Sequence, residues 1–513
     1  MCGRLCCPFH GQFFTFSSFG FPVILKNVFF SNTVRQFRTA VRRCLKSLSS
    51  GFCRNRFPFT NRDPFAERAF GTKSLHDAPP GTYTFLQETN AGIRPDPARI
   101  RALTAAAGHQ TEKGPVMISQ DFKSMLERKS VIRNFAEYAA RRGREIGYEN
   151  VFDYSLGNPS VPVPDSYKDA VFRLYSTLPS AALHGYSPTL GNPNYKKAVA
   201  DSLTRRFDVP YTPELIFPTS GAAGAIAHAC RAVVRPGEEV LCFAPFFPEY
   251  REYINRTGAV LRVVPANTEN FQINFDAFES MIREKTAAVL INFPNNPSGV
   301  VLSEETMIHL ADLLRAKQEE YGHEIFLLSD EPYREILFDG KKCPYPAAYY
   351  DNTLTCYSFS KCLSLPGERI GYVAVCPRAK DADVLVPMMG QISRGIGHNC
   401  PASTAQLAVA EVIDQTADMS VYETNMNLLY DKLTELGFEM VRPGGTFYIF
   451  PKALEEDAVS FCRKALKYDL ILVPSDSFGV PGYFRMAYCI DTEKVKRSIP
   501  VLETFVHTEY PDR

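Results

Sequence analysis

Alternation of strand-like and helix-like segments in the middle of the chain is the feature that most constrains its fold. Apolar runs of strand length occur at 239–243, 287–292 and 325–328, and a helical segment occupies 303–321. Repeated β-then-α units predict a parallel sheet with right-handed crossovers. Ligands of such sheets bind beyond the carboxyl ends of the strands. We therefore predict an α/β fold whose functional side chains follow the strand ends.

Several side chains suited to binding or catalysis stand where these strands end. They are Phe247, Asn296, Asp330 and Lys361, each just past a strand-like run. The strand ends of a parallel sheet meet at one edge, so these side chains are expected to converge. Their joint placement is a stronger signal than any one of them.

Lys361 lies in an unusual setting within the stretch C-Y-S-F-S-K-C-L-S-L-P-G-E-R-I-G-Y, residues 356–372. Burying an unpaired ammonium is costly, but a lysine of lowered pKa suits imine chemistry, because only the neutral amine attacks a carbonyl. Ser358, Ser360 and Arg369 offer donors to a dianion, so the stretch indicates a lysine-bound aldehyde with a phosphate, which describes pyridoxal phosphate. Taken alone, S-x-S-K more often marks a loop lysine that extends to solvent.

Two further segments favour an anionic ligand. The stretch T-S-G-A-A-G at 219–224 opens a helix of small residues, and the free amides at such a helix start are a weak phosphate signal. Arg485 stands in an apolar strand after Gly482 with no acid beside it in sequence. Such an arginine suits a carboxylate ligand, although an internal salt bridge is an open alternative.

The N-terminal part differs in composition from the rest. Residues 1–62 contain ten Lys or Arg and no acid, so the overall balance of 57 basic and 56 acidic residues leaves a net charge of −9 on the remainder. An acidic body argues against nucleic acid as a partner. The 14 cysteines show no metal-site spacing, which indicates a reducing compartment and predicts no metal site.

The basic segment reads as a targeting sequence. An aromatic stretch of about a dozen residues at 13–25 precedes a basic amphipathic helix, which is typical of import into a mitochondrion or, second, a plastid. Residues 76–115 read as a disordered linker. The alternative is a start at Met117, which would give a cytoplasmic protein whose upstream stretch is never translated. The sequence contains no run of about 18 apolar residues, so stable membrane insertion is not expected.

Taken together, the motifs resemble the class I/II aminotransferases, the fold-type I pyridoxal-phosphate enzymes of the aspartate aminotransferase superfamily. The resemblance covers roughly 117–513 and rests on N-x-P-x-N-P-S-G at 292–299, D-x-x-Y at 330–333, S-x-S-K with an arginine eight residues on, and Arg485. It implies a mainly parallel large domain at 166–407 and a smaller α/β domain at 408–513. An arm at 117–165 would contribute to the smaller domain, after the leader and linker at 1–116.

The resemblance also implies a role for each motif residue. Lys361 would form the Schiff base and act as the base, and Asp330 would keep the ring nitrogen protonated. Amino transfer would run between an L-amino acid and a 2-oxo acid, with 2-oxoglutarate as the expected acceptor. Tyr333 and Asn296 would contact the phenolic oxygen, and Phe247 would cover the ring face. The phosphate would be held by Gly221, Ala222, Ser358, Ser360 and Arg369, and Tyr186 would reach the phosphate of a neighbouring subunit in a homodimer with shared active sites. The substrate carboxylate would be bound by Gly157, Asn296 and Arg485.

Departures from the family pattern leave the substrate open. Ala223 stands where bacterial aspartate-specific relatives often carry a lysine, and Phe247 replaces a tryptophan, so strict aspartate specificity is in doubt; Arg133 is a candidate substitute clamp. A fold-type I lyase, such as a carbon–sulfur β-lyase, would use the same lysine, aspartate and arginine. A pyridoxal-phosphate-sensing regulator would need a helix-turn-helix, which residues 1–116 do not suggest.

Overall fold

The computed structural model of the protein describes Lys123 and residues 131–512. The predicted leader, the linker and Met117 lie outside the described residues. The first helix described, α4, spans Val131–Ile146, and Lys123 is also helical. Within the described part, no helix is long and apolar enough to cross a membrane.

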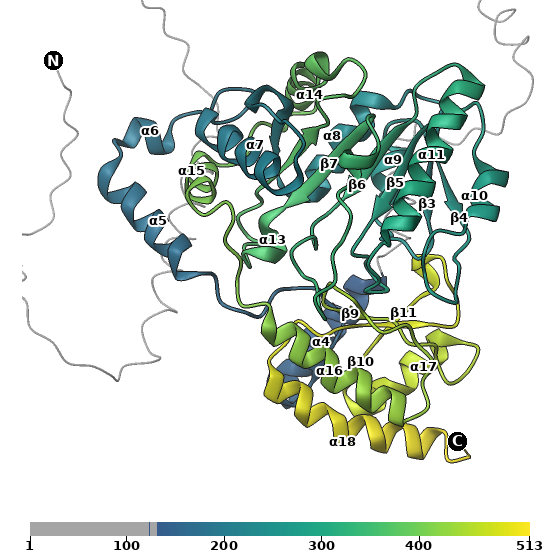
Figure 1. The fold of residues 1–513 in the computed structure, drawn as a ribbon. Helices are drawn as coiled ribbons and strands as arrows, with labels where there is room; N and C mark the ends of the chain where they lie inside the picture. The colour runs from purple at the N-terminus through teal and green to yellow at the C-terminus, as the bar shows by residue number, and fades with distance from the viewer. Residues whose placement is uncertain (1–122, 124–130, 513) are drawn as a thin grey trace, which may run out of the picture. The chain divides into compact units, whose positions relative to one another are not determined.

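A seven-stranded sheet forms the centre of the fold, in the order β2-β8-β7-β6-β5-β3-β4 (Figure 1). Only β8 runs antiparallel to its neighbours, which confirms the predicted α/β fold with a mainly parallel sheet. The strands are β2 (Ile216–Thr219), β3 (Glu239–Phe243), β4 (Val260–Val264), β5 (Thr286–Asn292), β6 (Phe326–Asp330), β7 (Thr353–Ser358) and β8 (Gly371–Val375).

Both faces of this sheet are buried against other elements. Successive strand side chains point to opposite sides, so both sets are apolar. On β3, Leu241 and Phe243 pack with α10 and α11, whereas Val240 and Cys242 pack in the cluster that contains α8. The strands therefore read as continuous apolar runs. The helices of this larger lobe are α5 (Asp165–Thr177), α6 (Ser180–His184), α7 (Pro193–Phe207), α8 (Gly221–Val233), α9 (Tyr250–Asn255), α10 (Phe275–Met281), α11 (Glu304–Tyr321), α12 (Pro346–Tyr349), α13 (Phe359–Cys362), α14 (Ala382–Gly395) and α15 (Ser403–Glu411).

A smaller lobe packs around its own core, which includes Phe461, Phe484 and Phe505. Its antiparallel sheet has the order β11-β12-β9, and β1 pairs in parallel with β10. Figure 1 shows its helices beside these strands. Besides α4, its elements are β1 (Phe152–Asp153), β9 (Tyr448–Ile449), β10 (Leu470–Ile471), β11 (Val473–Pro474), β12 (Phe484–Ala487), α16 (Ser420–Glu435), α17 (Ala458–Ala465) and α18 (Thr492–Glu509).

Some element limits differ from the sequence reading. The strand expected at 325–328 extends to Asp330, because the polar residues Ser329 and Asp330 are held by pairing with β5 and β7. β2, β4 and β8 were not anticipated from the sequence. β2 contains Pro218 and β8 opens with Gly371, residues that are poor strand signals, and β4 is a half-exposed edge strand.

Candidate active site

One cavity of about 300 Å³ lies at the carboxyl edge of the large sheet. It brings together all the predicted site residues except Gly221 and Tyr186. Asn292 and Asp330 are paired neighbours at the ends of β5 and β6, and Ser358 ends β7. The predicted residues that line the cavity are Gly157, Ala222, Phe247, Asn296, Asp330, Tyr333, Ser358, Ser360, Lys361, Arg369 and Arg485.

Asp330 presents one free carboxylate oxygen. Its Oδ2 accepts hydrogen bonds from the Tyr250 hydroxyl and, at 3.3 Å, from Asn292 Nδ2, whereas its buried Oδ1 has no partner. Burial raises the pKa of Asp330 to about 7, and the hydrogen bond from Tyr250 acts in the opposite direction. An unpartnered buried acceptor is costly, so Oδ1 is suited to a ligand N–H.

Lys361 faces Asp330 across the same cavity. It lies on the short helix α13, whose N-cap Ser358 accepts from the Ser360 amide. Its Nζ donates a 2.7 Å hydrogen bond to the Gly157 carbonyl oxygen. Burial lowers its pKa from 10.5 to about 8, and the charges of Arg369 and Arg485 add to the effect. The lysine is thus a substantially better nucleophile near neutral pH than a solvated one.

The N-terminus of α8 forms an anion cradle with Ser358 and Arg369. Gly221 has φ +79°, and a Cβ added there would lie 3.1 Å from Arg369 Nη2 and 3.3 Å from Ser358 Oγ. Arg369 Nη2 also donates to the Ser220 carbonyl oxygen at 2.9 Å, which holds the guanidinium at this helix end. Glycine therefore keeps open the space among these donors, where backbone amides favour an anion.

Arg485 supplies the cationic group on the smaller lobe's side. It is fully buried on β12, where Nη1 donates to Asn296 Oδ1 at 3.1 Å and Nη2 donates to the Ser155 carbonyl oxygen. Its Nε is buried without a partner. Among the described residues it forms no ion pair, so the internal salt bridge considered from the sequence is absent there. This arrangement leaves a directed donor for a carboxylate.

Aromatic side chains complete the walls. The Tyr333 and Tyr448 hydroxyls lie 3.1 Å apart, and the Phe247 ring meets the Tyr250 ring edge-on at 5.7 Å. A Cβ on Gly157 would lie only 1.9 Å from the Tyr448 hydroxyl oxygen, so that position requires glycine. The main chain at Gly157 also lies close to Lys361, whose Nζ donates to the Gly157 carbonyl oxygen.

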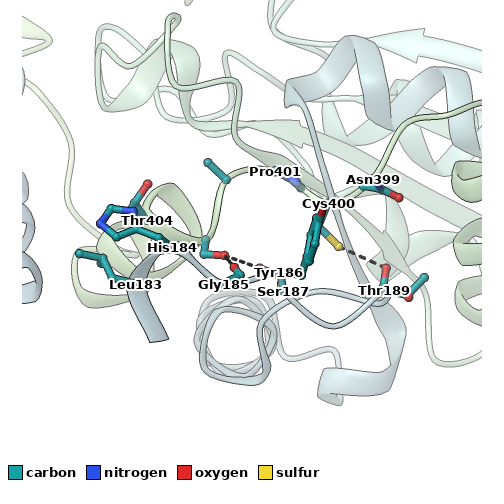
Figure 2. Close-up of a pocket in the computed structure, with 12 residues that line it drawn as sticks. Leu183, His184, Gly185, Tyr186, Ser187, Thr189, Asn399, Cys400, Pro401 and Thr404 are labelled. Atoms are coloured by element: carbon teal, nitrogen blue, oxygen red, sulfur yellow. Dashed lines mark hydrogen bonds between the residues drawn. The ribbon is translucent and has the colours of Figure 1, made fainter. Parts of the chain in front are cut away.

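Tyr186 lies elsewhere, as its predicted role across a subunit interface requires. Its side chain is fully exposed, with a relative accessibility of 102%. It stands in an open cavity of about 460 Å³ formed by segments 183–189 and 399–404 (Figure 2). Within this chain Tyr186 does not line the cavity of Lys361. Its contact with a neighbouring phosphate stays a prediction.

Several residues of the site were missed by sequence reasoning. Tyr250 and Asn292 orient Asp330, and Tyr448 covers Gly157. A signal existed for Asn292, the first residue of the N-x-P-x-N-P-S-G motif, whose Oδ1 accepts from the Asn296 amide at 2.8 Å. For Tyr250, the only signal in the sequence was its position three residues after Phe247.

Arg133 lies at the mouth of the cavity. It is 3.7 Å from Glu249, and its side chain is 75% exposed, so this ion pair contributes little to stability. Tyr253 donates to the same carboxylate at 2.8 Å. Arg133 is therefore placed where a substrate's far end would enter, but it is already partnered.

The donor set fits pyridoxal phosphate. The unpartnered Asp330 Oδ1 suits a pyridinium N–H, Lys361 suits an aldehyde, and the glycine cradle with Arg369 suits a phosphate dianion. Among the described residues no group of His, Cys, Asp or Glu could hold a metal ion. An α/β sheet with this cavity at its strand ends defines a pyridoxal-phosphate enzyme of the aspartate aminotransferase fold.

Comparison with known proteins gives the family. The profile of the family described as "Aminotransferase class I and II" matches residues 149–502, so the chain belongs to this family and is a pyridoxal-phosphate-dependent transaminase. It is similar to a "Probable N-acetyl-LL-diaminopimelate aminotransferase" of Bacillus subtilis, with 29% identity over 74% of this chain and 93% of that protein. A "Probable aspartate/prephenate aminotransferase" of Aquifex aeolicus is 30% identical over 68% of this chain and 89% of that protein.

Solved structures agree with this assignment. The crystal structure of an amino transferase from Eubacterium rectale has a TM-score of 0.75 and 42% identity, covering 77% of this chain and 100% of that chain. An aspartate aminotransferase from Thermotoga maritima has a TM-score of 0.67 and 25% identity, covering 74% and 97%. The predicted family, fold and cofactor are thereby confirmed.

Proposed function

We propose that the protein moves an amino group between an L-amino acid and a 2-oxo acid, with 2-oxoglutarate as acceptor and Lys361 as both covalent anchor and base. One observation carries this proposal. Lys361, with its lowered pKa, shares a cavity with an unpartnered acceptor on Asp330 and an unpartnered donor on Arg485. An amine, a ring-nitrogen partner and a carboxylate partner are the groups that transamination needs.

The larger lobe's residues hold the cofactor. Bound pyridoxal phosphate supplies an electron sink that stabilises negative charge at the substrate's Cα. Asp330 Oδ1 would accept the ring N–H, and that contact would lower the pKa of this carboxyl from its raised value. Tyr333 and Asn296 would orient the phenolic oxygen. The phosphate would be held by the Gly221 and Ala222 amides, Ser358, Ser360 and Arg369. Phe247 covers the ring face.

The residues around Lys361 control the proton. The neutral Nζ would take the proton from the substrate's Cα and later give it up again, which makes Lys361 the base. Its hydrogen bond to Gly157 gives the free amine a defined position. Arg485 fixes the substrate's α-carboxylate through Nε, with Nη1 held by Asn296, so that Cα lies toward Lys361.

A substrate screen tests this proposal. Each of the twenty amino acids is incubated with purified holoenzyme and 2-oxoglutarate, and glutamate and the new 2-oxo acid are measured together. Stoichiometric formation of both supports transfer and identifies the donor. The named relatives differ in substrate, so their names do not select one. Pyruvate and ammonia from cystathionine, without glutamate, would instead support the carbon–sulfur lyase alternative.

We also propose a homodimer with shared sites, supported by the full exposure of Tyr186. The test mixes two weak variants, Lys361→Ala and Tyr186→Phe, after joint unfolding and refolding. A mixed dimer would contain one site with an intact lysine and an intact tyrosine from the other subunit. Activity above that of either variant alone is expected. Additive activity together with a monomer by light scattering would contradict the proposal.

A further inference from the structure

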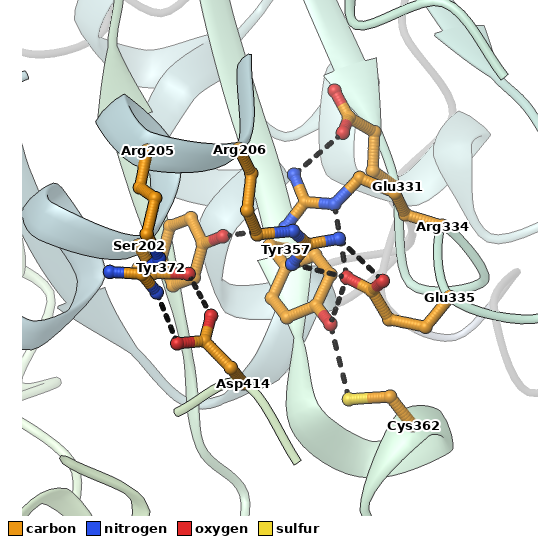
Figure 3. Close-up of polar contacts among 10 residues, drawn as sticks. All are labelled: Ser202, Arg205, Arg206, Glu331, Arg334, Glu335, Tyr357, Cys362, Tyr372 and Asp414. Carbon is orange, nitrogen blue, oxygen red and sulfur yellow. Dashed lines mark hydrogen bonds and ion pairs between the residues drawn. The ribbon is translucent and has the colours of Figure 1, made fainter. Parts of the chain in front are cut away.

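A buried polar network adjoins the catalytic segments without lining the cavity. Arg334 is its centre and is 7% exposed. Its Nη1 donates to Glu331 at 2.9 Å, its Nη2 donates to the Tyr372 hydroxyl at 2.8 Å, and its Nε lies 3.3 Å from Glu335 (Figure 3). We call this set the Arg334 network: Arg206, Glu331, Arg334, Glu335, Tyr357, Cys362 and Tyr372.

Members of the network alternate with cavity residues along the chain. The neighbouring pairs are Asp330–Glu331, Tyr333–Arg334, Tyr357–Ser358 and Lys361–Cys362. Within a strand such as β7, consecutive side chains point to opposite faces. No member of the Arg334 network is among the residues that line the cavity. The network therefore acts on the cavity through its chain neighbours and through the charge of Glu331, which acts with burial to raise the pKa of Asp330.

The network spans the segments that must be aligned. The Arg334 guanidinium lies 4.2 Å over the Tyr357 ring, and Tyr357 stacks on Tyr372 across β7 and β8 at 5.1 Å. The Tyr357 hydroxyl is 3.2 Å from Glu335 Oε1 and 3.1 Å from Cys362 Sγ. Contacts thus run continuously from the turn after β6 to the residue next to Lys361.

The network contains two arginines and two glutamates, and its geometry depends on arginine. Arg206 donates to both oxygens of Glu335, at 3.0 Å and 2.6 Å, from α7. Burial opposes ionisation of Glu335, yet Arg334 and Arg206 hold its pKa below the ordinary value. Arg334 donates in three directions from one planar group that also stacks on a ring. A lysine keeps the charge but cannot copy this fork.

We propose that Arg334 is a positioning residue, which sets the Asp330–Tyr333 turn against the Ser358–Lys361 segment. The inference rests on the proposed function, because it concerns the alignment of those same groups. Buried ionic networks often add little net stability, since desolvation offsets attraction, but they do restrict geometry. Misplacement of reacting groups by about 1 Å can lower a rate about 100-fold.

The test compares Arg334→Lys with a matched control in full-length holoenzyme. Arg142 donates to both oxygens of one carboxylate in the smaller lobe, with Nε 2.7 Å and Nη2 3.3 Å from Asp469. Arg142→Lys therefore removes the directed contacts of a more exposed arginine away from the cavity and controls for the loss of an arginine–carboxylate contact as such. For each variant we would measure kcat, KM, the Tm of apo- and holoenzyme, and the pH titration of the absorbance of the lysine-bound cofactor.

Arg334→Lys should lower kcat about tenfold while KM changes by less than about threefold. The midpoint of its absorbance titration should move by about 0.5 pH unit or more. Arg142→Lys should leave the midpoint and kcat at wild-type values even if its Tm falls. A midpoint and kcat equal to wild type in Arg334→Lys would overturn the proposal.

A second variant keeps the test decisive if Arg334→Lys does not fold. Tyr357→Phe removes only the hydroxyl between Glu335 and Cys362, and a midpoint shift in the same assay is expected. An unchanged midpoint in that variant would equally overturn the inference. Failure of the proposed function is distinguishable, because wild-type enzyme would then show no amino transfer in the substrate screen.

Discussion

The two walls of the active-site cavity are built in different ways. The cofactor wall, which includes Asp330, Ser358 and Lys361, comes from adjacent strand ends of a sheet that is buried on both faces. The carboxylate wall, which includes Gly157, Tyr448 and Arg485, comes from short strands and a loop of the smaller lobe. Hydrogen bonds that join the walls are Lys361 to Gly157, Arg485 to Asn296 and Tyr333 with Tyr448.

This difference separates the chemistry from substrate recognition. The cofactor wall holds an unpartnered acceptor and an amine of lowered pKa, both set by burial within one sheet. The carboxylate wall holds an unpartnered donor on a fully buried arginine. Changes in the first wall should therefore act mainly on kcat, and changes in the second mainly on KM.

The largest effect should come from Lys361→Ala in the cofactor wall. It removes the amine that we propose as covalent anchor and base, so turnover should be abolished. The fold should persist, because deleting a half-buried lysine that makes one hydrogen bond leaves the apolar core intact. The measurements are turnover, circular dichroism and the loss of the cofactor–lysine absorbance. Turnover at the wild-type rate would contradict the assigned role.

Asp330→Asn should keep most cofactor affinity but reduce kcat by more than about tenfold, roughly 1.4 kcal/mol of barrier. The amide cannot hold the ring nitrogen's proton as a carboxylate does. Steady-state kinetics with cofactor in excess separate the two parameters, and fluorescence titration gives the cofactor Kd. A smaller fall in kcat would refute the electron-sink role of this residue.

Arg485→Lys tests the carboxylate wall. An ammonium cannot keep the hydrogen bonds to Asn296 and Ser155 and also offer a directed donor to substrate. KM for donor and acceptor should rise about tenfold or more, with a smaller change in kcat. An unchanged KM for every substrate tested would place Arg485 outside substrate binding.

Sequence reasoning found most side chains of both walls but missed Tyr250 and Asn292 beside Asp330, and Tyr448 beside Gly157. Motifs such as D-x-x-Y and S-x-S-K keep their residues close in sequence, because consecutive strand ends lie side by side at one edge of a parallel sheet. Tyr250 was missed because its partner, Asp330, is 80 residues away and an ordinary tyrosine carries no local signal. The Arg334 network was missed for the same reason, since its members belong to separate elements.

The raised pKa of Asp330 predicts a pH dependence in the apoenzyme. Its folded-state pKa of about 7 exceeds the ordinary 3.8, so the protonated carboxyl is favoured in the folded state. The associated contribution to the free energy of unfolding is fully present below about pH 4 and is lost as pH rises through about 7. The loss amounts to about 4 kcal/mol at most. Chemical unfolding of apo wild type and apo Asp330→Asn at several pH values measures this. Parallel pH profiles would show that Asp330 does not titrate in this window.

The smallest effect on activity should come from removing residues 1–116. The predicted cofactor and substrate contacts lie between Gly157 and Arg485, so a chain that begins at Met117 should fold, dimerise and retain full kcat.

We propose that the removed part directs import into a mitochondrion or, second, a plastid, because it combines an aromatic stretch with a basic, acid-free segment. Imaging residues 1–116 fused to a fluorescent protein tests the targeting role, with a fusion lacking residues 1–62 as control. A diffuse cytosolic signal from the intact fusion would defeat targeting and favour translation from Met117, whereas lost activity in the shortened enzyme would show that the walls depend on the leader.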